Sequence, residues 1–142
     1  MRNMAFKVVD RLFVVVCIGN PSGTEWCDYL DAVEQNGIER TSHLVFTDGG
    51  RPNATQRRYL EKTLAGRPVP VAVVSGSVSV RGVVTVLSWF NRKIRAFPRT
   101  DSGLRDSLAY LEIPASRAEL ITRERDRLRA SLSTMAEEGR TV

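Results

Sequence analysis

Five short runs of apolar residues have the composition of β-strands: Phe6 to Val9, Leu12 to Ile18, His43 to Phe46, Val71 to Val74 and Ile94 to Phe97. Leu12 to Ile18 is apolar at every position, which is typical of a strand whose two faces are both covered by helices. Only Asp10 and Arg11 separate it from the preceding run, so the first two strands are predicted to form a tight antiparallel hairpin. Ile94 to Phe97 alternates in polarity, as a half-exposed edge strand does.

The stretches between these runs have apolar residues at intervals of three and four, which predicts amphipathic helices over about 22–36, 53–65, 80–91, 102–111 and 116–137. Ser22 and Glu25 stand three residues apart, as in a helix-opening capping box. Asn53 and Gln56 repeat this spacing at the start of the second helix. Trp26 is expected to anchor its helix in the core, and stacking on an aromatic ligand is the alternative.

Two helices carry more detailed expectations about packing. The helix over 53–65 is expected to turn Tyr59, Leu60 and Leu64 inward. The last helix is strongly charged and has a thin apolar stripe, formed by Leu120, Ile121, Leu128, Leu132 and Met135. A thin stripe packs on its own domain or forms half of a helical pair between two copies of the protein. Two heptads are few for a coiled coil, which favours packing on the domain over a homodimer.

The alternation of strands and helices predicts an α/β fold, with a mixed, mostly parallel sheet that begins with an antiparallel hairpin and is covered by helices. Residues 1–114 form this domain and residues 115–142 form a C-terminal charged amphipathic helix. A chain of 142 residues, 42% of them apolar, is long enough for one core. No run approaches the roughly 20 apolar residues of a membrane span, and no signal peptide is evident at the N-terminus, so we expect a cytoplasmic location.

The net charge of +5 is unevenly distributed along the chain. Residues 49–100 contain ten Lys or Arg against the single acid Glu61, an excess of nine positive charges. Such an excess suggests an anionic partner, either an acidic protein surface or an anionic membrane, unless the groups are scattered over several faces as a solubilising surface. Nucleic acid is the least favoured partner, because the region has few aromatic residues for base stacking.

The residue types that catalysis needs do not converge in this sequence. Cys17 and Cys27 lack metal-ligand or redox spacing, and both are expected to be buried thiols. His43, the single histidine, stands at the start of a strand and is expected at the surface or strand edge. No phosphate-binding loop, dinucleotide fingerprint or nucleophile elbow is present. We therefore expect no enzymatic activity, no cofactor and no metal, although Asp48 leaves an anion-handling enzyme as a minor alternative.

Polar, glycine-containing loops follow the third and fourth predicted strands. Because parallel strands end at the same sheet edge, these loops are expected to lie together beside helix N-termini, where anions and partners bind. The candidate binding residues are Thr47, Asp48, Gly49, Gly50, Arg51, Asn53, Thr55, Arg57, Ser75, Ser77 and Ser79. Asp48 has a structural alternative, in which its carboxylate accepts the N–H groups of Gly50 or Arg51. A second set of candidates for contact with a membrane or an acidic partner comprises Arg92, Lys93, Arg95 and Arg99.

The order of elements, with its main loop after the third strand, resembles the STAS domain of sulfate transporters and anti-sigma-factor antagonists. The segment Thr47 to Asn53 and the segment Ser88-Trp89-Phe90-Asn91 are similar to motifs of small bacterial STAS/SEC14-type proteins. The resemblance covers residues 6–113 and leaves out the last helix. It implies a STAS-like fold and a regulatory module that acts through a protein partner.

The two branches of this resemblance imply different ligands. In the antagonist branch a partner kinase phosphorylates a serine or threonine at the start of the second helix. Here Asp48 matches the acid of the family motif, but Gly49 and Gly50 follow it, so Thr47 and Thr55 are the nearest hydroxyls. The SEC14-like branch implies an apolar ligand or a membrane lipid, with the basic segment 92–99 touching lipid headgroups.

Overall fold

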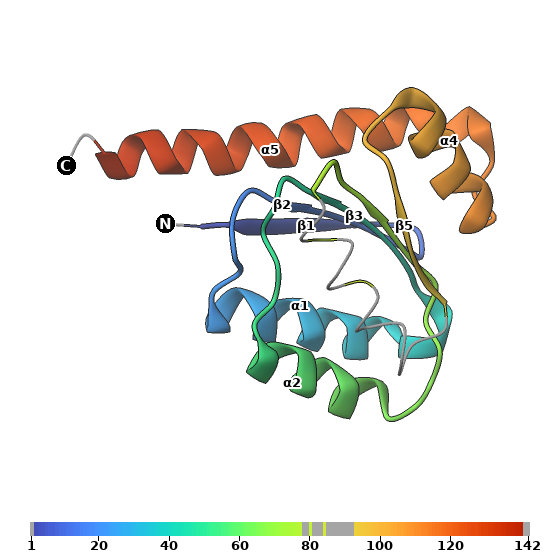
Figure 1. The fold of residues 1–142 in the computed structure, drawn as a ribbon, viewed down its shortest axis with the longest axis horizontal. Coiled ribbons are helices and arrows are strands. Elements are labelled where there is room, and N and C mark those ends of the chain that lie inside the picture. Colours follow the sequence, from blue (N-terminus) through green and yellow to red (C-terminus); the bar gives the residue numbers. More distant parts are fainter. Residues whose placement is uncertain (1, 78–79, 81–83, 85–92, 141–142) are drawn as a thin grey trace.

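A computed structural model of the chain describes residues 2–77, 80, 84 and 93–140. Within them, five strands form one sheet in the order β1-β2-β3-β4-β5 (Figure 1). The strands are β1 (Met4–Val9), β2 (Leu12–Cys17), β3 (Ser42–Thr47), β4 (Val71–Val74) and β5 (Ile94–Phe97). β1 pairs antiparallel with β2, and the other neighbours pair in parallel. The predicted α/β class, the hairpin and the mostly parallel sheet are confirmed.

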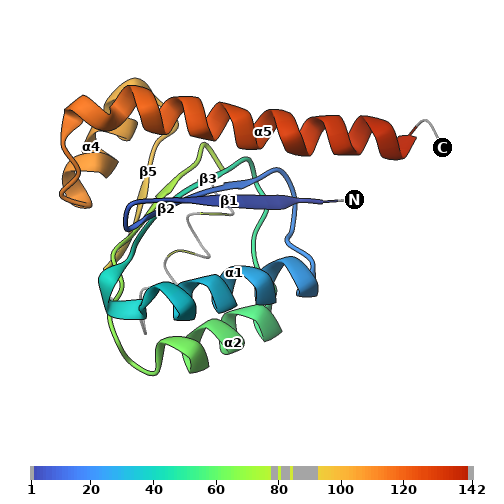
Figure 2. The same ribbon diagram turned by 180° about the vertical axis from the view of Figure 1, so that it is seen from behind.

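Helices cover both faces of this sheet. α1 (Gly23–Asn36) and α2 (Ala54–Leu64) lie on one face, and α4 (Asp101–Tyr110) and α5 (Ala118–Arg140) lie on the other, as both views show (Figures 1 and 2). Two short 3₁₀ turns, η1 (Ile38–Arg40) and η2 (Ala115–Arg117), precede β3 and α5. Most of the helix predicted over 80–91 lies outside the described residues.

β2 shows why the uniformly apolar run required two layers of helices. Phe13 and Val15 pack with the side chains of α1, whereas Val14 and Val16 pack with those of α4 and α5. Phe13, Val14 and Val16 are fully buried, so neither face of the strand reaches solvent. Burying such a side chain contributes about 1.5–3 kcal/mol, which makes this strand the centre of the core.

The predicted capping boxes are both present, at Ser22 with Glu25 and at Asn53 with Gln56. The Glu25 carboxylate also accepts the backbone N–H groups of Asn3 and Met4, at 2.9 and 2.8 Å, and so ties the start of β1 to α1. Partial burial opposes its ionisation, but the hydrogen bonds outweigh burial and lower the pKa of Glu25.

α5 packs on the sheet of its own domain, which is the arrangement that the sequence favoured over a helical pair. Ile121 and Leu132 are 1% exposed within the core of the α4/α5 face. The buried Glu124 forms an ion pair with Lys7 of β1, with 3.5 Å between Nζ and Oε2. Leu120, predicted in the buried stripe, is 41% exposed, because the inward face follows Ile121, Leu128 and Leu132 instead. The side chain of Met135, the last residue of the predicted stripe, lies outside those described.

Two further burial predictions are wrong for the same geometric reason. Cys27 is exposed, because the inward face of α1 consists of Trp26, Tyr29, Leu30 and Val33. Tyr59 is 44% exposed, because α2 turns Gln56, Leu60 and Leu64 inward at intervals of four residues. In each helix the misplaced residue lies directly beside the inward stripe.

Candidate functional site

The loops after β3 and β4 lie at the same sheet edge, as predicted, because the two strands are parallel neighbours. We call this the carboxyl edge. In the β3–α2 loop, Gly49 has a φ of +112°, a conformation that favours glycine. A Cβ atom on Gly50 would lie 2.0 Å from the carbonyl oxygen of Gly19, so the loop fits tightly against the loop between β2 and α1. Both glycines therefore shape the backbone.

Hydrogen bonds fix the β3–α2 loop to its neighbours. The Thr47 hydroxyl donates to the Gly50 carbonyl at 2.7 Å, and the Arg51 N–H donates to Asn20 Oδ1 at 3.0 Å. The Gln56 side chain donates to the Pro21 carbonyl at 2.9 Å. The loop is thus a rigid platform rather than a free linker.

The predicted site residues divide by accessibility. The buried members, which support the loops, are Thr47, Gly50 and Ser75. The exposed or half-buried members, which a partner can reach, are Asp48, Gly49, Arg51, Asn53, Thr55, Arg57 and Ser77. The hydroxyls of Ser75 and Ser77 accept the N–H groups of Ser77 and Val80, at 3.1 and 3.4 Å, so they shape the second loop. Ser79 lies outside the described residues.

Asp48 does not cap the loop, and this alternative is wrong. Its side chain continues the β3 alternation on the side of Leu44 and Phe46, toward α5. There Asp48 Oδ1 accepts from Arg99 at 2.5 Å, and Asp48 Oδ2 lies 3.7 Å from a guanidinium nitrogen of Arg129. Asp48 thus links β3 to α5, a contact that local sequence could not reveal.

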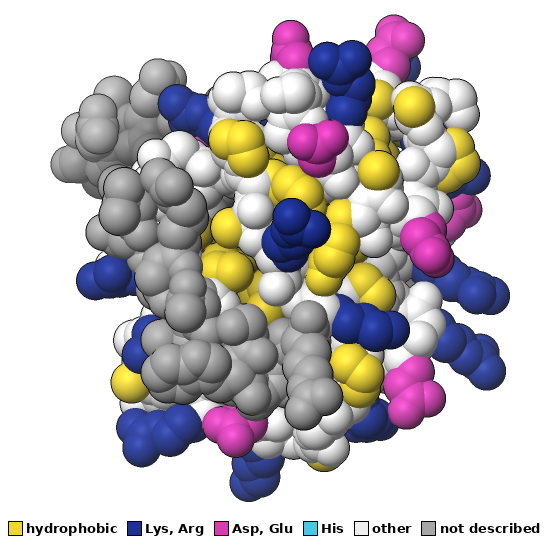
Figure 3. Space-filling view, turned by 45° about the vertical axis from the view of Figure 1, so that its right-hand side comes forward, with side chains coloured by type: hydrophobic (Ala, Val, Ile, Leu, Met, Phe, Trp, Pro, Cys, Tyr) yellow, Lys and Arg dark blue, Asp and Glu magenta, His cyan; other side chains and the backbone are white. Residues whose placement is uncertain are grey.

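The described members of the second basic set lie on β5 and on either side of it. Lys93, Arg95 and Arg99 are exposed, and the Arg95 guanidinium lies 5.5 Å from the centre of the Phe97 ring. Arg92 lies outside the described residues. On the face shown in Figure 3, the Lys and Arg side chains are spread among acidic and apolar groups rather than gathered into one patch.

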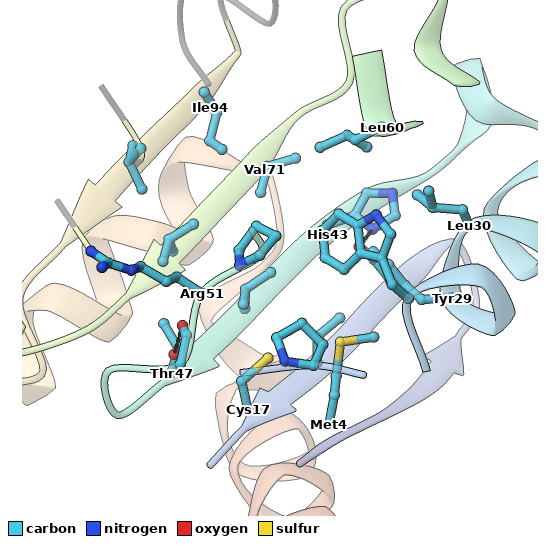
Figure 4. A pocket seen from close by; sticks show the side chains of 18 of the residues that line it. Met4, Cys17, Tyr29, Leu30, His43, Thr47, Arg51, Leu60, Val71 and Ile94 are labelled. Atoms are coloured by element: carbon cyan, nitrogen blue, oxygen red, sulfur yellow. Dashed lines mark hydrogen bonds between the residues drawn. The ribbon is translucent and has the colours of Figure 1, made fainter. Parts of the chain in front are cut away.

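A cavity of about 110 Å³, with walls that are almost entirely apolar, lies between the sheet and the α1/α2 layer. Leu30, Leu60, Val71 and Ile94 line it, as the close-up shows (Figure 4). Arg51 lies at one end of the cavity, away from the buried aromatic side chains at the other end. No sequence pattern predicts this cavity, because it arises from the fit of separate elements.

A chain of polar side chains lies at the aromatic end of this cavity. The Thr41 hydroxyl donates a hydrogen bond to the Ile38 carbonyl at 3.2 Å. The Thr41 oxygen therefore accepts the hydrogen bond from His43 Nε2, at 3.1 Å. His43 is therefore the neutral Nε2–H tautomer, and its Nδ1 accepts the hydroxyl proton of Tyr29. Each hydrogen-bonding atom of these three side chains has a partner, so the three groups form part of the core and leave no free base.

The predicted surface position of His43 is wrong, because its side chain is buried between β2 and α1. It is 2% exposed and stacks on Phe13 with ring centres 4.7 Å apart. Burial lowers the pKa of His43 from 6.5 to about 3, since a charged ring would lose its hydration. Burial, reinforced by the negative charge of Glu25, raises the pKa of the Cys17 thiol to about 12. Cys17 is thus a structural thiol, as predicted.

Among the described residues, no group of three His, Cys, Asp or Glu side chains is placed to hold a metal ion. In the same part of the chain, no helix combines the length and apolar character needed to cross a bilayer. Comparison with known proteins found no family model, no curated protein and no solved structure that matches this chain. The resemblance to STAS domains therefore stays a prediction from the sequence motifs.

Proposed function

We propose that this protein is a non-enzymatic, STAS-like regulatory module that binds an acidic surface of a partner protein through its carboxyl edge. The observation that carries the proposal is the β3–α2 loop, which is hydrogen-bonded into a rigid platform yet exposes Arg51 beside the start of α2. A pre-ordered loop loses little conformational freedom on binding, which favours affinity.

The charges of this platform favour an acidic partner. Arg51 is exposed, and Arg57 is half-buried with its guanidinium donating to the Pro52 carbonyl at 2.9 Å. The N-terminus of α2 adds the positive end of a helix dipole, with Asn53 as the cap. Thr55 is exposed in the first turn, so it is the accessible hydroxyl if this edge is regulated by phosphorylation.

Charge reversal tests the proposal directly. Tagged protein is used to capture partners from an extract of its own host, and the captured proteins are quantified by mass spectrometry. The double variant Arg51→Glu with Arg57→Glu should reduce a specific partner at least tenfold. The matched control is Arg11→Glu with Arg40→Glu, which makes the same charge change at exposed positions of the opposite sheet edge. Equal loss in both variants, or no loss in either, would contradict binding at the carboxyl edge.

The apolar cavity favours a second candidate function, binding of a small amphiphilic ligand or of one short apolar part of a lipid. Its volume of about 110 Å³ is below the ~150 Å³ of an engineered cavity that holds benzene, so it suits a short apolar segment with an anionic group near Arg51. Native mass spectrometry of protein purified from its host tests this reading, because a bound ligand adds mass that denaturation removes.

Membrane contact through the basic segment is tested separately. Retention on anionic vesicles should weaken with salt and with neutral replacement of Arg92, Lys93, Arg95 and Arg99. Retention that is unchanged by these replacements would rule out the basic segment as the contact surface.

For the cavity, a native mass spectrum without added mass would rule out a resident ligand.

A further inference from the structure

A second cavity, of about 260 Å³, lies at the carboxyl edge on the α4/α5 side of the sheet. Three arginines from two separate segments converge on it, Arg99 after β5 and Arg125 and Arg129 from α5. The pocket shares Thr47 and Asp48 with the carboxyl edge but lies on the α4/α5 face, whereas Arg51 of the β3–α2 platform lines the cavity on the opposite face. We infer that this second cavity binds a phosphate group, and we call it the arginine pocket.

The arginine pocket is rich in N–H donors, because each of its three guanidinium groups carries five. Three guanidinium groups face two carboxylates, those of Asp48 and Asp101. Asp48 is shared, since it accepts from Arg99 at 2.5 Å and lies 3.7 Å from Arg129. Asp126, outside the lining, lies 3.1 Å from Arg125, so the formal charges of these groups balance, and it is the number of N–H donors that favours an oxyanion ligand.

Arg129 provides the most specific indication of a missing acceptor. Its Nε atom is buried and has no hydrogen-bond partner among the residues that the structure describes. A buried N–H group without an acceptor is unfavourable, and a guanidinium that lacks one is rare in folded proteins. A small shift of the Arg129 side chain would bring this atom to an oxyanion in the pocket, beside the nitrogen that already lies near Asp48.

The remaining walls suit an oxyanion with a small attached group. The Arg125 guanidinium lies 5.3 Å from the centre of the Phe46 ring, so the ring holds the cation in place by a cation–π contact. Thr100 caps the N-terminus of α4 and also lines the pocket, which adds the positive end of a ten-residue helix. Planar guanidinium groups match phosphate oxygens in pairs, so a phosphate dianion fits this donor set.

The test is a titration followed by the Nε–H signals of arginine in ¹H–¹⁵N spectra at constant ionic strength. The probes are inorganic phosphate and glycerol 1-phosphate, with chloride as the control anion. The Arg129 Nε–H signal should shift saturably with phosphate and not with chloride. A tighter response to the ester than to inorganic phosphate would identify a phosphorylated small molecule as the ligand class, and the reverse order would identify free phosphate.

Two variants make the result specific to the arginine pocket. Affinity followed at the backbone amides of α4 should fall at least tenfold in Arg129→Gln. It should stay within twofold in Arg123→Gln, which removes an exposed arginine of the same helix that pairs with Glu119 outside the pocket. Equal affinity in both variants, or no saturable shift at millimolar phosphate, would overturn the inference. Neither outcome depends on the partner bound by the β3–α2 platform, so the two proposals fail separately.

Discussion

Acidification should destabilise the fold through His43 before the carboxylates begin to protonate. The pKa of His43 is about 3 in the folded protein and 6.5 as the reference for the unfolded chain. Below pH 6.5 the unfolded chain binds a proton at His43 that the folded protein does not. The free energy of unfolding therefore keeps the full His43 contribution above pH 6.5 and loses it as the pH drops toward 3. At ~1.36 kcal/mol per unit, the loss between pH 7 and pH 5 is about 2 kcal/mol.

Urea unfolding at the two pH values measures this loss, and the variant His43→Gln is the control. The variant should be less stable at pH 7 by roughly 1–3 kcal/mol, because it disturbs the hydrogen bonds to Tyr29 and Thr41. Its stability should change by less than about 0.5 kcal/mol between pH 7 and pH 5, because no buried imidazole remains to titrate.

A direct titration keeps the test decisive even if the variant does not fold. His43 is the single histidine of the chain, so its ring signals in an NMR spectrum are unambiguous. They should stay unchanged from pH 7.5 to pH 5, and long-range ¹H–¹⁵N spectra should show the proton on Nε2. A ring that titrates near pH 6.5 would refute the buried hydrogen-bond chain.

Three further predictions concern the loops and thiols. Gly50→Ala should lower the free energy of unfolding by about 3 kcal/mol or more, because the new Cβ would lie 2.0 Å from a carbonyl oxygen. The control Gly76→Ala should change it by less than about 0.5 kcal/mol, because a Cβ there has no atom within 4 Å. Ala65→Gly should stabilise the protein by about 0.5–1 kcal/mol, because Ala65 has the left-handed φ of 49°; thermal melts measure each of these changes. In native protein, Cys27 should react with iodoacetamide while Cys17 reacts only on unfolding, and mass spectrometry of the labelled peptides would show any early reaction of Cys17.

The features predicted well from the sequence depend on residues close together in the chain. The β1–β2 hairpin follows from two runs separated by a two-residue turn, and the capping box of Ser22 and Glu25 follows from a spacing of three. The double-sided burial of β2 follows from its uninterrupted apolar run. Local backbone geometry fixes the hairpin and the capping box, and the polarity of successive residues predicts the burial of β2, so a short sequence pattern contains all three.

The features that the sequence missed depend on contacts between distant segments. His43 can be buried because Tyr29 and Thr41 provide hydrogen-bond partners for both of its nitrogens. The spacing of apolar residues does not predict these hydrogen bonds. Asp48 pairs with Arg129 because α5 packs on the sheet face to which the Asp48 side chain points. The two cavities likewise arise from imperfect fit between elements, which hydrophobic patterning does not specify.

Hydrogen–deuterium exchange of the protein with its captured partner tests binding at the carboxyl edge most directly. The account predicts slower exchange in peptides that cover 48–57 and 75–77 when the partner is bound, with exchange in α5 and β1 unchanged. Protection confined to α5 or to β1, with the carboxyl edge exchanging as in the free protein, would contradict the proposed function.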